Sequence, residues 1–225
     1  MAAPGEEGWL SHQGGKLDAP GLQQQWSNLD RPARILVSNV AGDEAATRLA
    51  AVVGELWGLT PNFAATLANG YGVSIAYDNP KQLGVDRWLA MIAAFNTAKT
   101  PVLVVDCGTA VTLDAIDQRG KHLGGVIAPG MAMMWDSLFS RTRIPGVEQK
   151  IFNGPLGTNT AQCVAAGAQQ SVAGLIERVY RQLPGQSQGN WQVLLTGGDA
   201  GRLVKQLNLP VELRPQLVFE GLDLL

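Results

Sequence analysis

The sequence predicts an α/β protein, because segments with the pattern of strands alternate with segments with the pattern of helices. Residues 102–106 (VLVVD) are too apolar to face water on either side, which indicates a strand inside a sheet. Residues 158–183 form the longest predicted helix, and Pro184 and Gly185 stop it. With 225 residues, 46% of them hydrophobic and 16% charged, the chain can bury a sizeable core in one large domain or two small lobes.

Composition argues against several classes of function. The net charge is −2 and Lys and Arg form no cluster, so nucleic acid is a poor candidate partner. Cys107 and Cys163 are too far apart to indicate a disulfide framework, which favours a reducing compartment, and with His12 and His122 they do not have the spacing of a zinc site. No apolar run reaches the roughly 18 residues of a membrane helix, and residues 1–15 do not have the pattern of a signal peptide. We therefore expect a cytoplasmic protein with no membrane partner.

The first third of the chain predicts one strand and one helix. Residues 1–30 are polar, and only residues 8–12 are expected to contribute a fragment of an edge strand. Residues 33–40 (ARILVSNV) predict a strand. The helix that follows can be capped by Asp43, and Gly58 is expected to end it.

The centre of the chain predicts a loop, a helix and two paired strands. Residues 77–87 (YDNPKQLGVDR) form a turn-rich loop, and a helix is expected over roughly 86–97. The strand 102–106 then pairs with a second strand, which turns at Arg119 and Gly120. The remaining elements are expected to be a short helix near 131–139, a loop over 140–157, the long helix, a linker over 185–190, a strand over 191–196, a helix over 200–207 and the tail 217–222.

The turn after the strand 102–106 carries an acid, a glycine and a hydroxyl. Asp106 emerges at the carboxyl end of the strand, where open α/β folds place their ligands. Gly108 lets a backbone amide approach an anion closely, and Thr109 can donate to a phosphate oxygen. This pattern indicates a site in which the acid binds a cation and the neighbouring amide and hydroxyl donate hydrogen bonds to a phosphate. An ordinary hairpin with Asp at its turn would explain the same string. Cys107 has no His near it in sequence, so we interpret it as a small packing residue.

Asp86 is the second acidic candidate. It lies at the start of a predicted helix, where the helix dipole favours a carboxylate. An ionised carboxylate with an open face can take a proton from a substrate hydroxyl, and Arg87 beside it can form a fork onto a substrate carboxylate or phosphate. The alternative interpretation is a helix cap followed by a surface arginine.

Three further strings have a functional and a purely local interpretation. Gly124 and Gly125, with Pro129 and Gly130, permit a nucleotide to lie on the backbone or permit a turn. Residues 196–200 (TGGDA) could face a nucleotide or cap a helix, and residues 158–160 (TNT) are cap residues by type. The fingerprints of P-loop enzymes, standard Rossmann dehydrogenases and α/β-hydrolases are absent from the sequence.

Taken together and in this order, these strings resemble the type III pantothenate kinases, a family of the actin-like, sugar-kinase and Hsp70 superfamily. The resemblance implies two ribonuclease-H-like lobes, which we place at residues 1–98 and 99–225, with ATP in the cleft between them. It covers about residues 30–225 and is carried by Tyr77 with Asn79 and Pro80, by 83–87 (LGVDR), by 106–110 (DCGTA) with Thr112 and Asp114, by 124–130 (GGVIAPG), by 157–160, by 196–200 and by 220–222 (EGL).

The resemblance also implies an activity, the ATP-dependent phosphorylation of pantothenate to 4'-phosphopantothenate, which is the first step of coenzyme A biosynthesis. It implies that Asp86 is the proton acceptor, that Asp106 holds a monovalent cation (potassium or ammonium), that Gly108 and Thr109 contact ATP, and that magnesium takes part. The family is typically homodimeric. The residues implied to contact pantothenate are Tyr77, Gly84, Val85, Asp86, Arg87 and Thr160.

One departure from the family pattern concerns the start of the chain. Family members begin with a strand that ends in Asp-x-Gly-Asn-Thr/Ser, the first phosphate loop, and nothing in residues 1–32 matches it. We therefore expect an incomplete first lobe, with neighbouring backbone groups left unpaired and phosphoryl transfer weakened. An alternative function is then a non-catalytic pantothenate-binding or regulatory protein, like the Bvg accessory factors of the same family. A third possibility is a different small-molecule kinase of the superfamily.

Overall fold

The computed structural model describes residues 17–98, 100–144, 152, 154–185 and 191–225. They fall into two compact units, one that runs to Ala65 and one from Thr66 to Leu224. The helix α3 (Val85–Ala98) belongs to the second unit, where it packs against the sheet, and the lobes expected at 1–98 and 99–225 stay a prediction. The edge strand expected over 8–12 lies outside the described residues.

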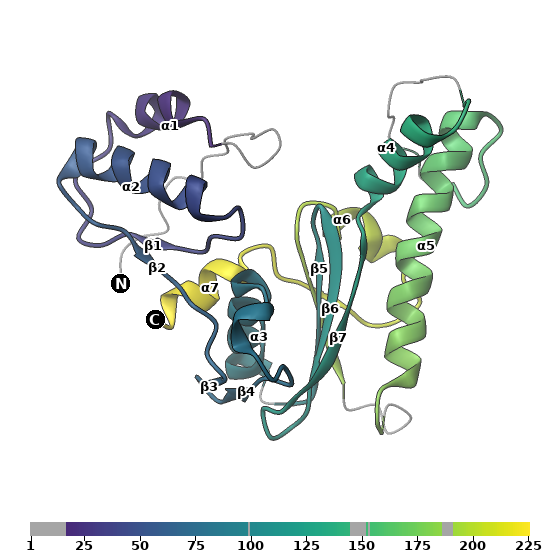
Figure 1. Cartoon of the computed structure of the whole chain (residues 1–225). Coiled ribbons are helices and arrows are strands. Elements are labelled where there is room, and N and C mark those ends of the chain that lie inside the picture. The colour runs from purple at the N-terminus through teal and green to yellow at the C-terminus, as the bar shows by residue number, and fades with distance from the viewer. Residues whose placement is uncertain (1–16, 99, 145–151, 153, 186–190) are drawn as a thin grey trace. The chain divides into compact units, whose positions relative to one another are not determined.

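The first unit is a small α/β arrangement. The strands β1 and β2 pair in parallel with α2 as the connection between them, and the rings of Trp26 and Trp57 stack at 5.5 Å to join α1 to α2. Its elements are α1 (Ala19–Trp26), β1 (Leu36–Val37), α2 (Asp43–Trp57) and β2 (Asn62–Phe63) (Figure 1).

Two local expectations in this unit are tested directly, and one helix was not expected. Gly58 ends α2 in the left-handed conformation, as predicted. The cap at the start of α2 is Gly42, and Asp43 is the first helical residue, so the expectation that Asp43 caps the helix is wrong. The helix α1 was not expected, although Asp18 caps it by accepting from the Gly21 N–H at 3.1 Å.

The second unit is built on a five-stranded sheet in the order β7-β6-β5-β8-β9. The strand β6 is antiparallel to both its neighbours, and the pairs β5–β8 and β8–β9 are parallel. Within this sheet only the second strand in chain order therefore runs against the rest, which is the ribonuclease-H-like arrangement that the resemblance implied. The strands are β5 (Val102–Cys107), β6 (Ala110–Ile116), β7 (His122–Pro129), β8 (Gln192–Thr196) and β9 (Glu212–Leu213).

Helices cover both faces of this sheet (Figure 1). On one face, α3 packs against β5 and β6 and is itself covered by α7 (Leu217–Asp223). On the other face lie α4 (Met131–Arg141), α5 (Thr160–Gln182) and α6 (Ala200–Leu203). The remaining short elements are β3 (Asn69–Gly70), β4 (Val73–Ser74) and the 3-10 turns η1 (Pro80–Gln82) and η3 (Val204–Gln206). No helix among the described residues is both long enough and apolar enough to cross a membrane.

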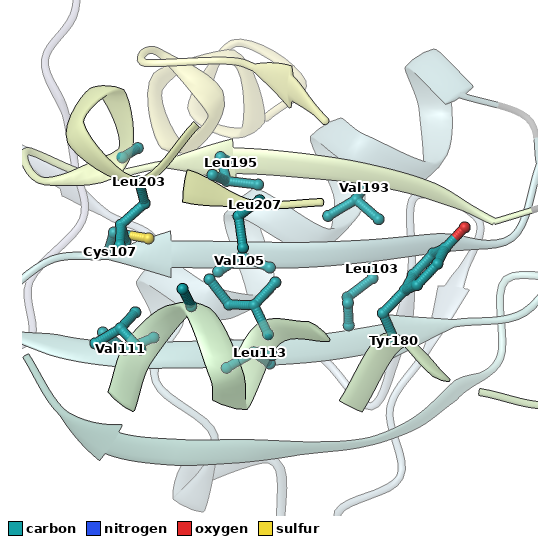
Figure 2. Packing of buried hydrophobic residues seen from close by; sticks show 14 of the residues in the cluster. Leu103, Val105, Cys107, Val111, Leu113, Tyr180, Val193, Leu195, Leu203 and Leu207 are labelled. Atoms are coloured by element: carbon teal, nitrogen blue, oxygen red, sulfur yellow. The ribbon is translucent and has the colours of Figure 1, made fainter. Parts of the chain in front are cut away.

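The main core lies between the sheet and α5. Leu103, Val105 and Cys107 of β5 point into it, and Tyr180 of α5 lies over one end of the cluster (Figure 2). Because side chains alternate along a strand, Asp106 faces the opposite side of the sheet, toward α3. In the register of the hairpin, Asp106 pairs with Thr112, and Asp114 lies two residues farther along β6 on the same face. The polar side chains of β5 and β6 are therefore directed at the start of α3.

The contact between α3 and α7 depends on Gly221. A Cβ at this position would overlap the carbonyl oxygen of Leu89. We expect Gly221→Ala to force the helices apart and to lower the free energy of unfolding by about 1–3 kcal/mol in urea titrations. The matched control is Gly174→Ala in α5, where a Cβ meets nothing within 4 Å and should raise stability by about 0.5–1 kcal/mol. Equal effects of the two substitutions would contradict the close approach of α7 to α3.

Candidate active site

Asp86 lies in the first turn of α3, as expected, and its carboxylate is oriented locally. Its Oδ1 accepts a hydrogen bond from the Arg87 backbone N–H at 2.8 Å. A Cβ at Gly84 would lie 2.6 Å from the same oxygen, so glycine leaves the space that the carboxylate fills. Val85 is buried, whereas Asp86 keeps part of its surface exposed. The carboxylate is therefore held from one side and open on the other.

Asp106 lies where two parallel strands end together. It is the residue of β5 that pairs with Thr196, the last residue of β8. A Cβ at Gly197 would overlap Asp106 Oδ1, and the Asp199 N–H donates to the Cys107 carbonyl oxygen at 3.0 Å. The turn that follows β8 is thus packed directly against the acid, which agrees with the position expected for a ligand site in an open α/β sheet.

The two carboxylates act on each other. Burial, and then the negative charge of Asp86, raise the pKa of Asp106 from its ordinary value of 3.8 to about 6. A bound cation would offset this accumulation of negative charge. No group of three or more His, Cys, Asp or Glu side chains that could hold a metal occurs in the part of the chain that the structure describes. A cation at Asp106 would therefore take further oxygen ligands from backbone, water or a bound phosphate.

The Arg87 side chain is buried and forms a bidentate ion pair with Asp114. Its Nε and Nη2 donate to the two carboxylate oxygens of Asp114 at 2.8 and 2.6 Å, and the guanidinium is also 5.8 Å from the centre of the Tyr77 ring. Nη1 donates to the Tyr77 hydroxyl at 3.1 Å. Burial alone would lower the pKa of Arg87, but the hydrogen bond and charge of Asp114 raise it overall. The Arg87 guanidinium, which the sequence predicted to face a ligand, is thus engaged by Asp114 and Tyr77. These three hydrogen bonds use three of its five N–H groups and leave two for other partners.

His122 completes this cluster, in a role that its sequence context did not predict. Its Nε2 lies 3.0 Å from Asp114 Oδ1, and its Nδ1 accepts from the Ala76 N–H at 3.3 Å. The imidazole also stacks on the Tyr77 ring, with centroids 6.3 Å apart. The one sequence signal was Asp114 itself, because a carboxylate on the covered face of a central strand requires buried partners.

The remaining predicted residues lie at two places. Thr109 is exposed in the turn between β5 and β6, and its carbonyl oxygen accepts from the Gly130 N–H at 2.9 Å. Thr160 is the exposed first residue of α5, and the cap is Asn159, which accepts from the Gln162 N–H at 3.1 Å. Thr160 lines a groove of about 1240 Å³ beside α4 and α5 whose described lining includes neither Asp86 nor Asp106.

Cys107 behaves as the packing residue that we predicted. It is 1% exposed and belongs to the main core. Burial, with the charges of Asp106 and Asp199, raises the pKa of its thiol to about 12, so a reactive thiolate does not form near neutral pH.

Comparison with known proteins decides the family. The sequence model described as Type III pantothenate kinase matches residues 13–182. A protein named Type III pantothenate kinase from Nitrosococcus oceani is 35% identical over 207 residues, which cover 89% of this chain and 78% of the relative. One of the same name from Nitrosomonas eutropha is 37% identical over 209 residues, with 91% and 80% covered. The chain belongs to the type III pantothenate kinase family. The resemblance drawn from its motifs is thereby confirmed.

A solved structure agrees with this assignment at the level of fold. A protein from Campylobacter jejuni, described as a Baf family transcriptional activator, aligns with 89% of this chain and 84% of its own, with a TM-score of 0.57 and 21% sequence identity. The likeness shows that the type III pantothenate kinase chain shares its fold with that protein.

The raised pKa of Asp106 has a measurable consequence for stability. Since its carboxyl binds a proton more tightly in the folded chain than in the unfolded chain, stability falls as the pH rises from about 4 to about 6. In buffers without metal cations, we expect Asp106→Asn to unfold at a higher temperature than the native chain above pH 6. Below about pH 4 the two should unfold alike. The exposed Asp223→Asn is the control, and native and Asp106→Asn curves that run parallel across this range would contradict the buried carboxylate.

Proposed function

We propose that this chain transfers the terminal phosphoryl group of ATP to pantothenate, producing 4'-phosphopantothenate for coenzyme A biosynthesis. The observation that carries the proposal is the pair Asp86 and Asp106, which come from different elements and are close enough for the charge of Asp86 to raise the pKa of Asp106. Phosphoryl transfer depends mainly on positioning and on charge neutralisation, and the site offers residues for both. Membership of the type III pantothenate kinase family supplies the substrate.

In this proposal Asp86 is the proton acceptor. Its carboxylate is oriented by the first turn of α3 and is partly exposed, so it can accept the proton of the attacking hydroxyl of pantothenate. Tyr77, Gly84, Val85 and Arg87 are close to Asp86 in the chain and would contact pantothenate. Thr160 lines the groove beside α4 and α5, and we assign it a contact with pantothenate on the family resemblance alone. The Tyr77 hydroxyl accepts from Arg87 and retains its own proton for the carboxylate of pantothenate.

The opposite side of the site would bind ATP. Gly108 and Thr109 follow Asp106 at the carboxyl end of β5 and would contact ATP. The Gly108 N–H already donates to the Ala110 carbonyl oxygen at 3.1 Å, so the donor that we assign to a phosphate oxygen is the Thr109 hydroxyl. Asp106 would hold a monovalent cation, potassium or ammonium, and magnesium would be held chiefly by the phosphates of ATP. These ions supply charge neutralisation when bound. We also propose a homodimer, on the family resemblance, and a cytoplasmic location, on the cysteine usage of the sequence.

The role of Asp86 is tested by Asp86→Asn, which keeps the shape of the side chain and removes the base. We expect kcat for pantothenate-dependent ATP consumption to fall on the order of 10²–10⁴-fold. The KM for ATP should stay within a few-fold of that of the native chain, and the control Asp223→Asn should keep full activity. Turnover by Asp86→Asn equal to that of the native chain would remove Asp86 from this role.

The same assay distinguishes the alternative function. A native chain that shows no turnover but unfolds at a higher temperature when pantothenate is added is a pantothenate-binding protein and not a kinase.

The cation at Asp106 is tested by exchange of salts. We expect turnover in potassium to exceed turnover in sodium, and potassium to raise the unfolding temperature of the native chain. Asp106→Asn should lose both responses, because the carboxylate that would hold the cation is gone. Equal stabilisation of Asp106→Asn by potassium would place the cation elsewhere.

A further inference from the structure

A buried polar cluster lies beside Asp86, and two of its members, Asp114 and His122, have no role in the chemistry proposed above. Its centre is Asp114, whose side chain is 2% exposed and accepts two hydrogen bonds from Arg87 and one from His122. A carboxylate buried to this extent needs partners for both oxygens, and a bidentate arginine together with an imidazole supplies them. The ion pair brings one negative and one positive charge, so the cluster adds no net charge to the site.

The hydrogen bonds of His122 define which nitrogen carries its proton. The side chain is fully buried, and its Nδ1 receives the Ala76 N–H, so this nitrogen presents its lone pair. The proton of the neutral ring is then on Nε2, which donates to Asp114 Oδ1. The imidazole therefore connects the backbone at Ala76 to the carboxylate and fixes the direction of that carboxylate.

The strand β7 leaves the space that the ion pair occupies. Gly125 pairs with Asp114 across the sheet, and a Cβ there would overlap Asp114 Oδ1 and lie 2.6 Å from Arg87 Nη2. Only glycine at this position allows the guanidinium to reach the carboxylate in this register. Residues from four segments, the loop before η1, α3, β6 and β7, thus meet in one arrangement.

The cluster is linked to Asp86 through the residue next to it. The Arg87 side chain is held by Asp114, and the Arg87 backbone N–H holds Asp86 Oδ1. We infer that Asp114 and His122 are positioning residues, which hold Arg87 and the first turn of α3 so that the Asp86 carboxylate faces Asp106. The inference rests on the proposed function, since it assigns these residues a part in the same reaction.

Two substitutions of His122 separate positioning from packing. His122→Phe keeps a ring against Tyr77 but removes both hydrogen bonds, whereas His122→Gln keeps an amide that can donate to Asp114. We expect His122→Phe to lower kcat roughly 10- to 100-fold while the KM for ATP stays within about two-fold, because a displaced base slows the chemical step without changing nucleotide binding. His122→Gln should recover most of the lost kcat.

The matched control is Trp191→Phe. Trp191 immediately precedes β8, at the end of this strand that is opposite to Thr196 and the site. This ring is also buried and donates one hydrogen bond, from Nε1 to the Pro184 carbonyl oxygen at 2.8 Å. We expect it to lower the unfolding temperature and to leave kcat unchanged. A native kcat in folded His122→Phe, or equal losses of kcat in His122→Phe and Trp191→Phe, would overturn the inference. If His122→Phe does not fold, Gly125→Ala disturbs the same ion pair with His122 intact and should give the same loss of kcat.

A measurement on the native chain keeps this inference distinct from the proposed function. The chain has two histidines, so the nitrogen NMR signals of His122 can be assigned by comparison with His12→Gln. We expect a protonated Nε2 and an unprotonated Nδ1. A proton on Nδ1 overturns the inference whether or not the chain phosphorylates pantothenate, and absence of turnover with the expected tautomer contradicts the proposed function instead.

Discussion

The alternation of side chains along β5 and β6 decides where everything else in the site lies. Leu103 and Val105 enter the core against α5, and this leaves Asp106 and Asp114 on the face covered by α3. A register shift of one residue in this hairpin would turn both carboxylates into the hydrophobic core. It would also turn the apolar side chains of the core toward the polar face of the sheet. The apolar pattern that folds the sheet is therefore the same pattern that brings the carboxylates to the start of α3.

The site divides its charges into a balanced part and an unbalanced part. Asp114 is compensated by Arg87 within the protein, at short distances and away from water. Asp86 and Asp106 have no such compensation from each other, and the consequence is the raised pKa of Asp106. The balanced pair can hold geometry in any state of the enzyme, whereas the unbalanced pair is suited to a bound cation and to the proton of a substrate. This division fits a phosphotransferase, in which position and charge contribute separately.

Local signals made part of this structure predictable from the sequence. The apolar run before Asp106, the loop before Asp86 and the terminating Gly58 each carry their structural cause within a few residues, and each was placed correctly. The cluster around Asp114 could not be found in this way, because Arg87 is 27 residues away from it in the chain and only the folded sheet brings them together. For the same reason the sequence suggested a ligand-facing or surface arginine at position 87, where the structure has a buried one. The helix α1 was missed because its polar composition outweighed the capping pattern at Asp18.

The contrast between the two cysteines gives the chain a useful chemical asymmetry. Cys107 is enclosed in the core and stays protonated, whereas the sulfur of Cys163 is accessible beside the groove along α5 and is only weakly engaged with the Gly157 carbonyl oxygen at 3.4 Å. Thiol-selective reagents will therefore modify one defined position of the folded molecule. A fluorophore attached to Cys163 would report ligand binding at the groove without any substitution in the sequence. The rate at which Cys107 becomes labelled would report the rate of unfolding.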